Sequence, residues 1–222
     1  MGKMIELTTK DGFKLSAYRA EATSKAKGGL VVIQEIFGVN HHIRAVGDRF
    51  AALGYTTIAP ALFDRVERGV DIGYDEAAIK RGQEVRAKTK LDDTLLDVQA
   101  AIDSLEGSGK IGVVGYCWGG SLAFLSATRL AGIACAVGYY GGMIAANAQE
   151  KPKVPVMLHF GEQDQGIPMS DVAKVRAARS DVEVYTYPAG HGFSCDERGS
   201  FNTASHEQAL ERTLGFFGKH LG

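Results

Sequence analysis

The sequence Gly115-Tyr116-Cys117-Trp118-Gly119-Gly120 directly follows a run of small and apolar residues over 110–114. Such a run predicts a strand, and the glycines on both sides of Cys117 predict a tight turn at its end. Residues 119–130 then predict a helix that begins at once. This is the pattern of a nucleophile elbow with cysteine in the usual place of serine. The N-terminal N–H groups of such a helix stabilise a thiolate and an oxyanion, so the motif predicts covalent catalysis by a thiolate.

The remainder of the chain alternates predicted strands and helices. An Asp-Gly turn at Asp11-Gly12 predicts an opening β-hairpin formed by residues 5–9 and 13–20. Further strands are expected over 28–34, 55–59, 133–139, 154–160 and 182–187, and helices over 42–53, 75–89, 91–105, 171–179 and 204–221, with a long loop over 61–74. This alternation predicts an α/β fold with a mostly parallel central sheet flanked by helices on both faces. Without a linker or repeat, one domain is expected over residues 1–222.

Bulk properties exclude several classes of function. The net charge of −1 provides no basic field for nucleic acid, and no apolar run approaches the length of about 20 residues that spans a bilayer. Cys117, Cys135 and Cys195 are odd in number and widely spaced, which favours free thiols in a reducing compartment and hence a cytoplasmic protein. The histidines other than His159 and His191 show no spacing typical of metal ligands, so no metal site is expected.

Two further residues follow predicted strands in an order that suits Cys117. Asp164 lies a few residues after the strand over 154–160, and His191 lies between two glycines after the strand over 182–187. The carboxyl ends of parallel strands meet at one edge of the sheet, so nucleophile, acid and histidine can converge there. His191 would take the thiol proton and Asp164 would orient the imidazole. Glu162 is the alternative acid.

Each of these residues also has a purely structural interpretation. Asp164 can cap a turn, and His191 can be a solvated loop residue. Cys135, within a strand, is expected to be a buried structural thiol, and His159 a core or pocket-wall residue. The glycines around Cys117 and His191 favour the catalytic interpretation.

An oxyanion hole requires two N–H donors. One is expected from Trp118, directly after the nucleophile, and the other from the loop over residues 34–38. Glu35 in that loop is unexpected, because a carboxylate beside a buried pocket is unfavourable unless it is paired. It is either a surface charge or a group that tunes the thiol or meets a substrate-binding arginine.

Four segments together resemble the dienelactone hydrolase family, within the α/β-hydrolase fold, over nearly the whole chain. They are the elbow itself, residues 34–40 (Gln-Glu-Ile-Phe-Gly-Val-Asn), residues 161–164 (Gly-Glu-Gln-Asp) and residues 190–193 (Gly-His-Gly-Phe). The resemblance implies a Cys117–His191–Asp164 triad, an oxyanion hole from the N–H groups of Ile36 and Trp118, and activation of Cys117 by Glu35. It also implies opening of an enol-lactone, dienelactone to maleylacetate, without a cofactor.

The chain departs from this family where the substrate carboxylate is bound. The family resemblance leads us to expect an arginine four residues after the triad histidine, and that position is Cys195. Arg198 is the nearest replacement, and Arg81 corresponds to the second family arginine; both can equally be surface charges. Phe37, Tyr139, Tyr140 and Phe193 are expected to line the pocket.

Three functions remain open from the sequence. The first is hydrolysis of enol-lactones or related activated esters through a thioester, by a monomer or homodimer acting on a small molecule. The second is a general small-ester or thioester hydrolase with the same triad. The third is a non-catalytic binding or redox protein that uses Cys117 as a reactive thiol. The natural substrate and pathway stay undefined.

Overall fold

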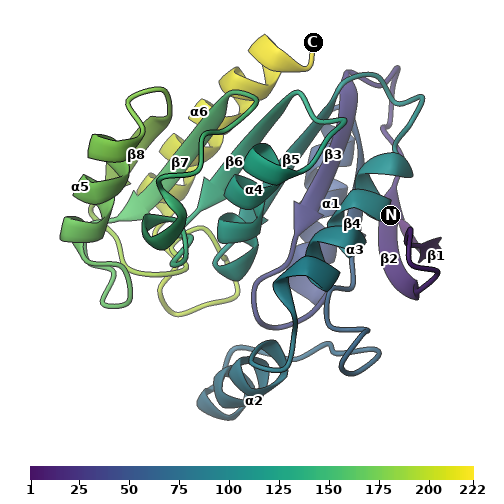
Figure 1. Cartoon of the computed structure of the whole chain (residues 1–222), viewed down its shortest axis with the longest axis horizontal. Coiled ribbons are helices and arrows are strands. Elements are labelled where there is room, and N and C mark those ends of the chain that lie inside the picture. The colour runs from purple at the N-terminus through teal and green to yellow at the C-terminus, as the bar shows by residue number, and fades with distance from the viewer.

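The computed structural model describes all 222 residues, which form eight strands, six α-helices and one 3₁₀ helix (Figure 1). The strands are β1 Lys3–Thr8, β2 Lys14–Ala20, β3 Gly28–Ile33, β4 Tyr55–Pro60, β5 Ile111–Tyr116, β6 Cys135–Tyr139, β7 Val156–Gly161 and β8 Glu183–Tyr187. The helices are α1 His41–Ala52, α2 Glu76–Arg86, α3 Leu91–Asp103, α4 Trp118–Arg129, α5 Met169–Ala178 and α6 Thr203–His220, with the 3₁₀ helix η1 over Ala145–Asn147.

All eight strands pair in one sheet in the order β1-β2-β4-β3-β5-β6-β7-β8. β1 pairs antiparallel with β2, and β2 pairs antiparallel with β4, whereas every later pair is parallel. Strands β3 to β7 are buried along their whole length, which explains their nearly continuous apolar sequence. The predicted mostly parallel sheet with an opening hairpin is confirmed.

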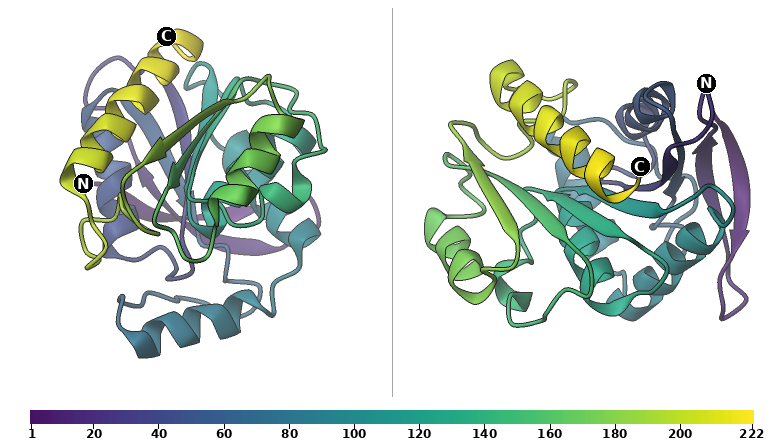
Figure 2. Two further views of the ribbon diagram at one scale, coloured as in Figure 1. Left: turned by 90° about the vertical axis from the view of Figure 1, so that its left-hand side faces the viewer. Right: turned by 90° about the horizontal axis from the view of Figure 1, so that it is seen from above.

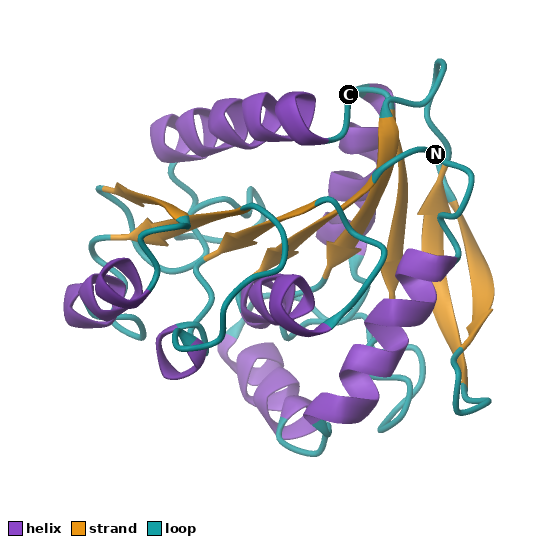
Figure 3. Cartoon of the chain, turned by 45° about the horizontal axis from the view of Figure 1, so that its top comes forward, coloured by secondary structure: helices purple, strands orange, loops and turns teal.

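Helices cover both faces of this sheet (Figures 2 and 3). On one face lie α1 and α6, where Phe50 and Phe217 pack with their ring centroids 6.1 Å apart. On the other face lie α3, α4 and α5, and α4 packs against both β5 and β6. None of the helices combines the length and apolar character required to cross a membrane.

Helix α2 stands apart from these two layers, beyond the carboxyl ends of the central strands (Figure 1). It is reached through the predicted loop over residues 61–74, and it contacts the chain after β3. Gly82, in the middle of α2, lies directly against the carbonyl oxygen of Ile36. Together α2 and the carboxyl ends of the strands enclose the region where the sequence places its reactive residues.

Local differences from the sequence prediction lie at element boundaries. Helix α5 begins at Met169 rather than residue 171, directly after Pro168, which serves as its N-cap. The predicted helix over 75–89 ends earlier, at Arg86, and begins after Asp75, whose side chain accepts a hydrogen bond from the Ala78 N–H. The 3₁₀ helix η1 was not predicted, because three residues carry no periodicity.

Candidate active site

The turn after β5 holds Cys117 in a strained backbone conformation. Its φ of 54° lies in the left-handed region, which non-glycine residues rarely adopt. The surrounding glycines allow this turn. A Cβ atom at Gly115 would lie 1.9 Å from the carbonyl oxygen of Gly119, and one at Gly119 would lie 2.5 Å from the carbonyl oxygens of Ile33 and Gln34. The elbow therefore tolerates no side chain at these two positions, and Cys117 is left half-buried at its tip.

Asp164 and His191 meet beside Cys117, as the sequence predicted. The Asp164 side chain is fully buried, and its Oδ2 lies 2.7 Å from His191 Nδ1. Its other oxygen, Oδ1, accepts hydrogen bonds from the N–H groups of Gly166 and Ile167 at 2.8 and 3.1 Å. The loop that carries Asp164 thus fixes the carboxylate, and the carboxylate fixes the imidazole. Glu162, the alternative acid, is exposed.

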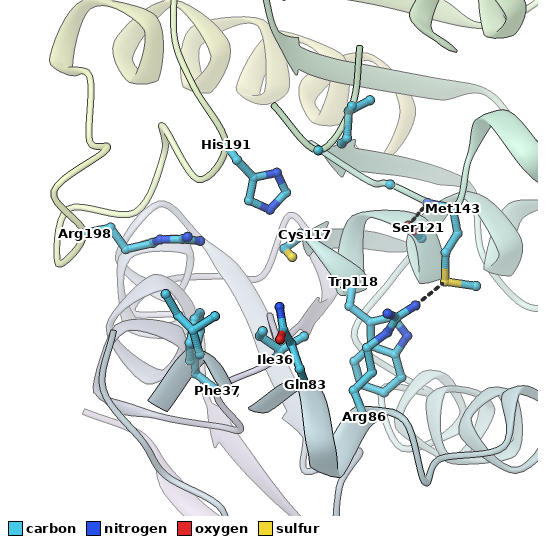
Figure 4. A pocket seen from close by; sticks show the side chains of 14 residues that line it. Ile36, Phe37, Gln83, Arg86, Cys117, Trp118, Ser121, Met143, His191 and Arg198 are labelled. Carbon is cyan, nitrogen blue, oxygen red and sulfur yellow. Dashed lines mark hydrogen bonds between the residues drawn. The ribbon is translucent and has the colours of Figure 1, made fainter. Parts of the chain in front are cut away.

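The ionisation of His191 reflects this arrangement. Burial alone would lower its pKa, but interactions with Asp164 and Cys117 outweigh burial and raise the pKa to about 10. At neutral pH the imidazole is therefore protonated, with its Nδ1 directed to Asp164. Its ring and the sulfur of Cys117 face the same space (Figure 4).

That space is a cavity of about 520 Å³. It is lined by residues from the β3–α1 loop, from α2, from the elbow, from the segment after β6 and from the loops after β7 and β8: Ile36, Phe37, Ile79, Gln83, Arg86, Cys117, Trp118, Ser121, Gly142, Met143, Gly166, Ile167, His191 and Arg198. A cavity of this volume has room for a small molecule beside the sulfur. No group of three His, Cys, Asp or Glu side chains is arranged to hold a metal ion.

Two backbone N–H groups at the cavity are free to donate. Trp118 is the first residue of α4, where an N–H has no acceptor within the helix. Ile36 lies in the loop after β3, and its N–H makes no hydrogen bond to the protein. Both residues line the cavity next to Cys117. The geometry is thus compatible with the predicted oxyanion hole.

Glu35 is buried and ion-paired. Its side chain is 1% exposed, and its Oε1 lies 3.0 Å from Nη1 of Arg198, while Oε2 has no partner. Burial would lower the pKa of Arg198, but the charge of Glu35 raises it above its usual range. The sequence left Glu35 as either a surface charge or a group that acts on the thiol or on an arginine. Its burial excludes the surface charge.

The predicted substrate-binding residues divide into two groups. Arg198 and Phe37 line the cavity, and the guanidinium carbon of Arg198 lies 5.6 Å from the centroid of the Phe37 ring. Cys195, in the expected position of an arginine, is fully buried, so Arg198 supplies a guanidinium from three residues further along.

Arg81, Tyr139 and Phe193 are not brought to the cavity. Arg81 is ion-paired with Glu67. Tyr139 is buried and hydrogen-bonded to Oγ1 of Thr213 at 2.6 Å. Phe193 packs in the core, with its ring centroid 5.2 Å from that of Tyr187. The strand position of Tyr139 and the loop position of Phe193 direct both side chains into the core.

Other predicted structural residues have the expected surroundings. His159 is buried in β7, with Nδ1 2.8 Å from the Tyr187 hydroxyl and Nε2 3.1 Å from the Thr213 hydroxyl. Cys135 is buried in β6, and all three cysteines are free. Tyr140, in contrast, was expected to line the pocket and does not: it is fully buried, with its ring centroid 5.1 Å from that of His191.

Sequence reasoning missed the contribution of α2. Ile79, Gln83 and Arg86 line the cavity and are spaced four and three residues apart, so they share one helix face that does not include Arg81. Arg86 has no carboxylate partner; its Nη2 lies 3.2 Å from the Met143 sulfur. The spacing places these three residues on one helix face, but nothing in the sequence of residues 75–89 shows that this face meets the cavity.

Comparisons with known proteins agree with this architecture. Residues 15–221 match the model of the dienelactone hydrolase family. A relative from Synechocystis, provisionally named a carboxymethylenebutenolidase, is 33% identical over 94% of this chain and 93% of its own length. Carboxymethylenebutenolidase 1 of Cupriavidus pinatubonensis is 27% identical over 95% of this chain and 94% of its own. A crystal structure from Klebsiella pneumoniae, provisionally named a dienelactone hydrolase, matches with a TM-score of 0.86 at 27% identity, covering 99% of this chain and 100% of that one.

Proposed function

The chain belongs to the dienelactone hydrolase family and is a hydrolase of the α/β-hydrolase fold, and we propose that it opens enol-lactones or related activated esters by nucleophilic attack of Cys117. One observation carries the proposal. The half-buried sulfur on the strained elbow lies beside an Asp164-bound imidazole, at the floor of a cavity large enough for a small substrate. A thiolate beside a protonated imidazole is the reactive form of a cysteine nucleophile.

The proposed reaction has two steps. The Cys117 thiolate attacks the ester or lactone carbonyl carbon, and the carbonyl oxygen becomes an oxyanion that accepts hydrogen bonds from the N–H groups of Ile36 and Trp118. The C–O bond breaks and the enolate leaves, taking the proton of the His191 imidazolium, so that the acyl group remains on sulfur as a thioester and the imidazole is left neutral. Loss of one oxyanion donor typically slows such a reaction about 100- to 1,000-fold.

Water then releases the acyl group. His191 accepts a proton from water, which attacks the thioester carbonyl, and the thiolate of Cys117 is expelled. Asp164 holds the imidazole with Nε2 towards the cavity throughout. An enolate is a good leaving group, whereas a thiolate is expelled in preference to an amine or alkoxide. The mechanism therefore favours enol-lactones and activated esters over amides.

Two guanidinium groups favour a substrate that carries a carboxylate. Arg198 lines the cavity with Glu35 as its partner, and Arg86 lines it with no carboxylate partner at all. A substrate carboxylate at either site would gain a charge-assisted hydrogen bond. This supports the enol-lactone as substrate more than a general neutral ester, the second candidate. Free thiols support the cytoplasm as the place of action.

Steady-state hydrolysis of p-nitrophenyl acetate and of a carboxylated enol-lactone tests the proposal. We expect Cys117→Ala to abolish both activities. Cys135→Ala is the matched control, because Cys135 pairs with Gly112 at the far end of β5 and does not line the cavity. Equal activity in wild type and Cys117→Ala would refute the proposal. A higher kcat/KM for neutral esters than for the lactone would favour the second candidate.

A further inference from the structure

The loop that follows His191 is tied to α1 by Asp196, whose carboxylate contacts one buried and one half-exposed side chain of that helix. The carboxylate of Asp196 lies with Oδ1 3.0 Å from Nδ1 of His42, and its Oδ2 is paired with the guanidinium of Arg49. His42 and Arg49 are seven residues apart on α1 and therefore share one face of the helix. The His42 side chain is 1% exposed. Asp196 thus bridges two turns of a rigid helix that lies outside the cavity.

The same loop carries His191 at one end and Arg198 at the other. Consecutive turns connect them: the Cys195 N–H donates to the Gly192 carbonyl at 3.0 Å, and the Arg198 N–H donates to the Cys195 carbonyl at 3.1 Å. Gly192 has a φ of 77°, and a Cβ atom there would lie 2.6 Å from Nη1 of Arg198. The guanidinium therefore lies directly on the loop backbone, and its position follows the fold of the loop.

The position of Arg198 matters because Glu35 has no other charge partner. Glu35 is 1% exposed, and only one of its two oxygens has a partner, which is Arg198. If the loop shifted, a buried carboxylate would lose its only counter-charge. Arg198 and Cys117 line the same cavity, so a shift of the guanidinium changes the space that the sulfur faces (Figure 4).

We propose that Asp196 is a positioning residue, which anchors the loop over residues 192–198 to α1 and thereby holds Arg198 between Glu35 and the cavity. The inference rests on the proposed function, in which Cys117 is the nucleophile. Asp196 itself does not line the cavity and touches no reacting atom.

A neighbouring carboxylate provides a matched control. Glu197 follows Asp196 on the same loop and contacts the adjacent histidine of α1, His41, whose side chain is 80% exposed. The two variants Asp196→Asn and Glu197→Gln each remove one negative charge and keep the side-chain size. The two carboxylates are similarly exposed, at 35% and 34%, but only Asp196 contacts a buried histidine, whereas the partner of Glu197 is an exposed histidine and such exposed ion pairs contribute little.

Two readouts are measured for each variant: kcat/KM for p-nitrophenyl acetate, and the rate of Cys117 alkylation by iodoacetamide, followed by peptide mass spectrometry. We expect Asp196→Asn to lower both by about tenfold or more, because displacement of about 1 Å at an active site can slow a reaction about 100-fold. Arg198 lines the same cavity as Cys117, so a displaced guanidinium changes the surroundings of the sulfur and slows alkylation. Glu197→Gln is expected to stay within about twofold of wild type. Equal effects of the two variants would overturn the proposal.

A double-mutant cycle tests whether Asp196 acts through Arg198. In an Arg198→Ala background, Asp196→Asn should have no further effect on either readout, because the group that it positions is gone. Independent, multiplying losses would contradict the proposal. If Asp196→Asn does not fold, as judged by circular dichroism, His42→Gln replaces it: His42 is the buried partner of Asp196, and its loss should lower both readouts in the same direction. Unchanged readouts in His42→Gln would then overturn the proposal.

The alkylation rate separates this inference from the proposed function. If Cys117→Ala retained full hydrolysis, the proposed function would fail, yet the alkylation cycle would still report whether Asp196 sets the surroundings of the sulfur through Arg198. If hydrolysis depended on Cys117 but the cycle showed no coupling, only the inference would fail.

Discussion

Gly82 in the middle of α2 is the position where a single methyl group should disturb the site most selectively. A Cβ atom there would lie 2.1 Å from the carbonyl oxygen of Ile36, whereas ordinary contact begins at 3.4 Å. Gly82→Ala therefore requires α2 and the Ile36 peptide to separate by about 1.3 Å. In an unconstrained helix the same substitution would be stabilising by about 1 kcal/mol.

This separation has one of two consequences. If the Ile36 peptide moves, its N–H leaves hydrogen-bonding range of the oxyanion, and kcat should fall about 100-fold, as for the loss of one donor. If α2 moves instead, Ile79, Gln83 and Arg86 withdraw from the cavity, and KM should rise while kcat changes less. In either case kcat/KM decreases, and the division between kcat and KM identifies the part that moved.

The assay is steady-state hydrolysis of p-nitrophenyl acetate, with thermal denaturation measured in parallel. Gly215→Ala is the matched control, because Gly215 also lies within a helix, α6, and a Cβ atom there would meet nothing within 4 Å. We expect the control to keep its kcat/KM and to gain a little stability. If Gly82→Ala behaved like Gly215→Ala in both measurements, the contact between α2 and Ile36 would not define the site.

Three further predictions concern charge. Burial opposes protonation of His191, but interactions with Asp164 and Cys117 outweigh it and raise the pKa from 6.5 to about 10. Protonated His191 therefore stabilises the fold fully below pH 6.5, and this stabilisation is lost as the pH rises through about 10. The Tm difference between wild type and His191→Asn should shrink over that range. Burial lowers the pKa of His159 to about 3, so the stability that its neutral form contributes above pH 6.5 is lost as the pH falls towards 3. The free energy of unfolding, measured by urea denaturation, should decrease by about 1.4 kcal/mol per pH unit over this range, and His159→Gln should lack this pH dependence. Arg86→Gln should raise KM for a carboxylated lactone about tenfold and leave p-nitrophenyl acetate within about twofold; a parallel loss for both substrates would refute carboxylate binding by Arg86.

The fold and the three converging residues were predictable because each depends on local sequence. The apolar runs of β3 to β7 reflect burial on both faces, and the glycines at positions 115 and 119 are required by contacts within the elbow itself. Asp164 and His191 follow their strands directly, so parallel pairing alone brings them to one edge. These signals need no knowledge of distant contacts.

The lining of the cavity was less predictable because it depends on how distant segments pack. Whether Arg81 or Arg86 lines the cavity is decided by the rotation of α2, which depends on the contact of Gly82 with Ile36. Similarly, Arg198 replaces an arginine expected at position 195 only because the loop over 192–198 turns twice before it reaches Glu35. No pattern within either segment reports such a contact.

The most direct test of the central claim is the identification of the residue that carries the acyl group. The protein is mixed with p-nitrophenyl acetate, quenched in acid before steady state, and digested for peptide mass spectrometry. The account predicts an acetyl group on Cys117, removable by hydroxylamine, which accumulates in His191→Asn because hydrolysis of the thioester is slowed. Turnover without acylation of Cys117, or with the acetyl group on another residue, would contradict the account.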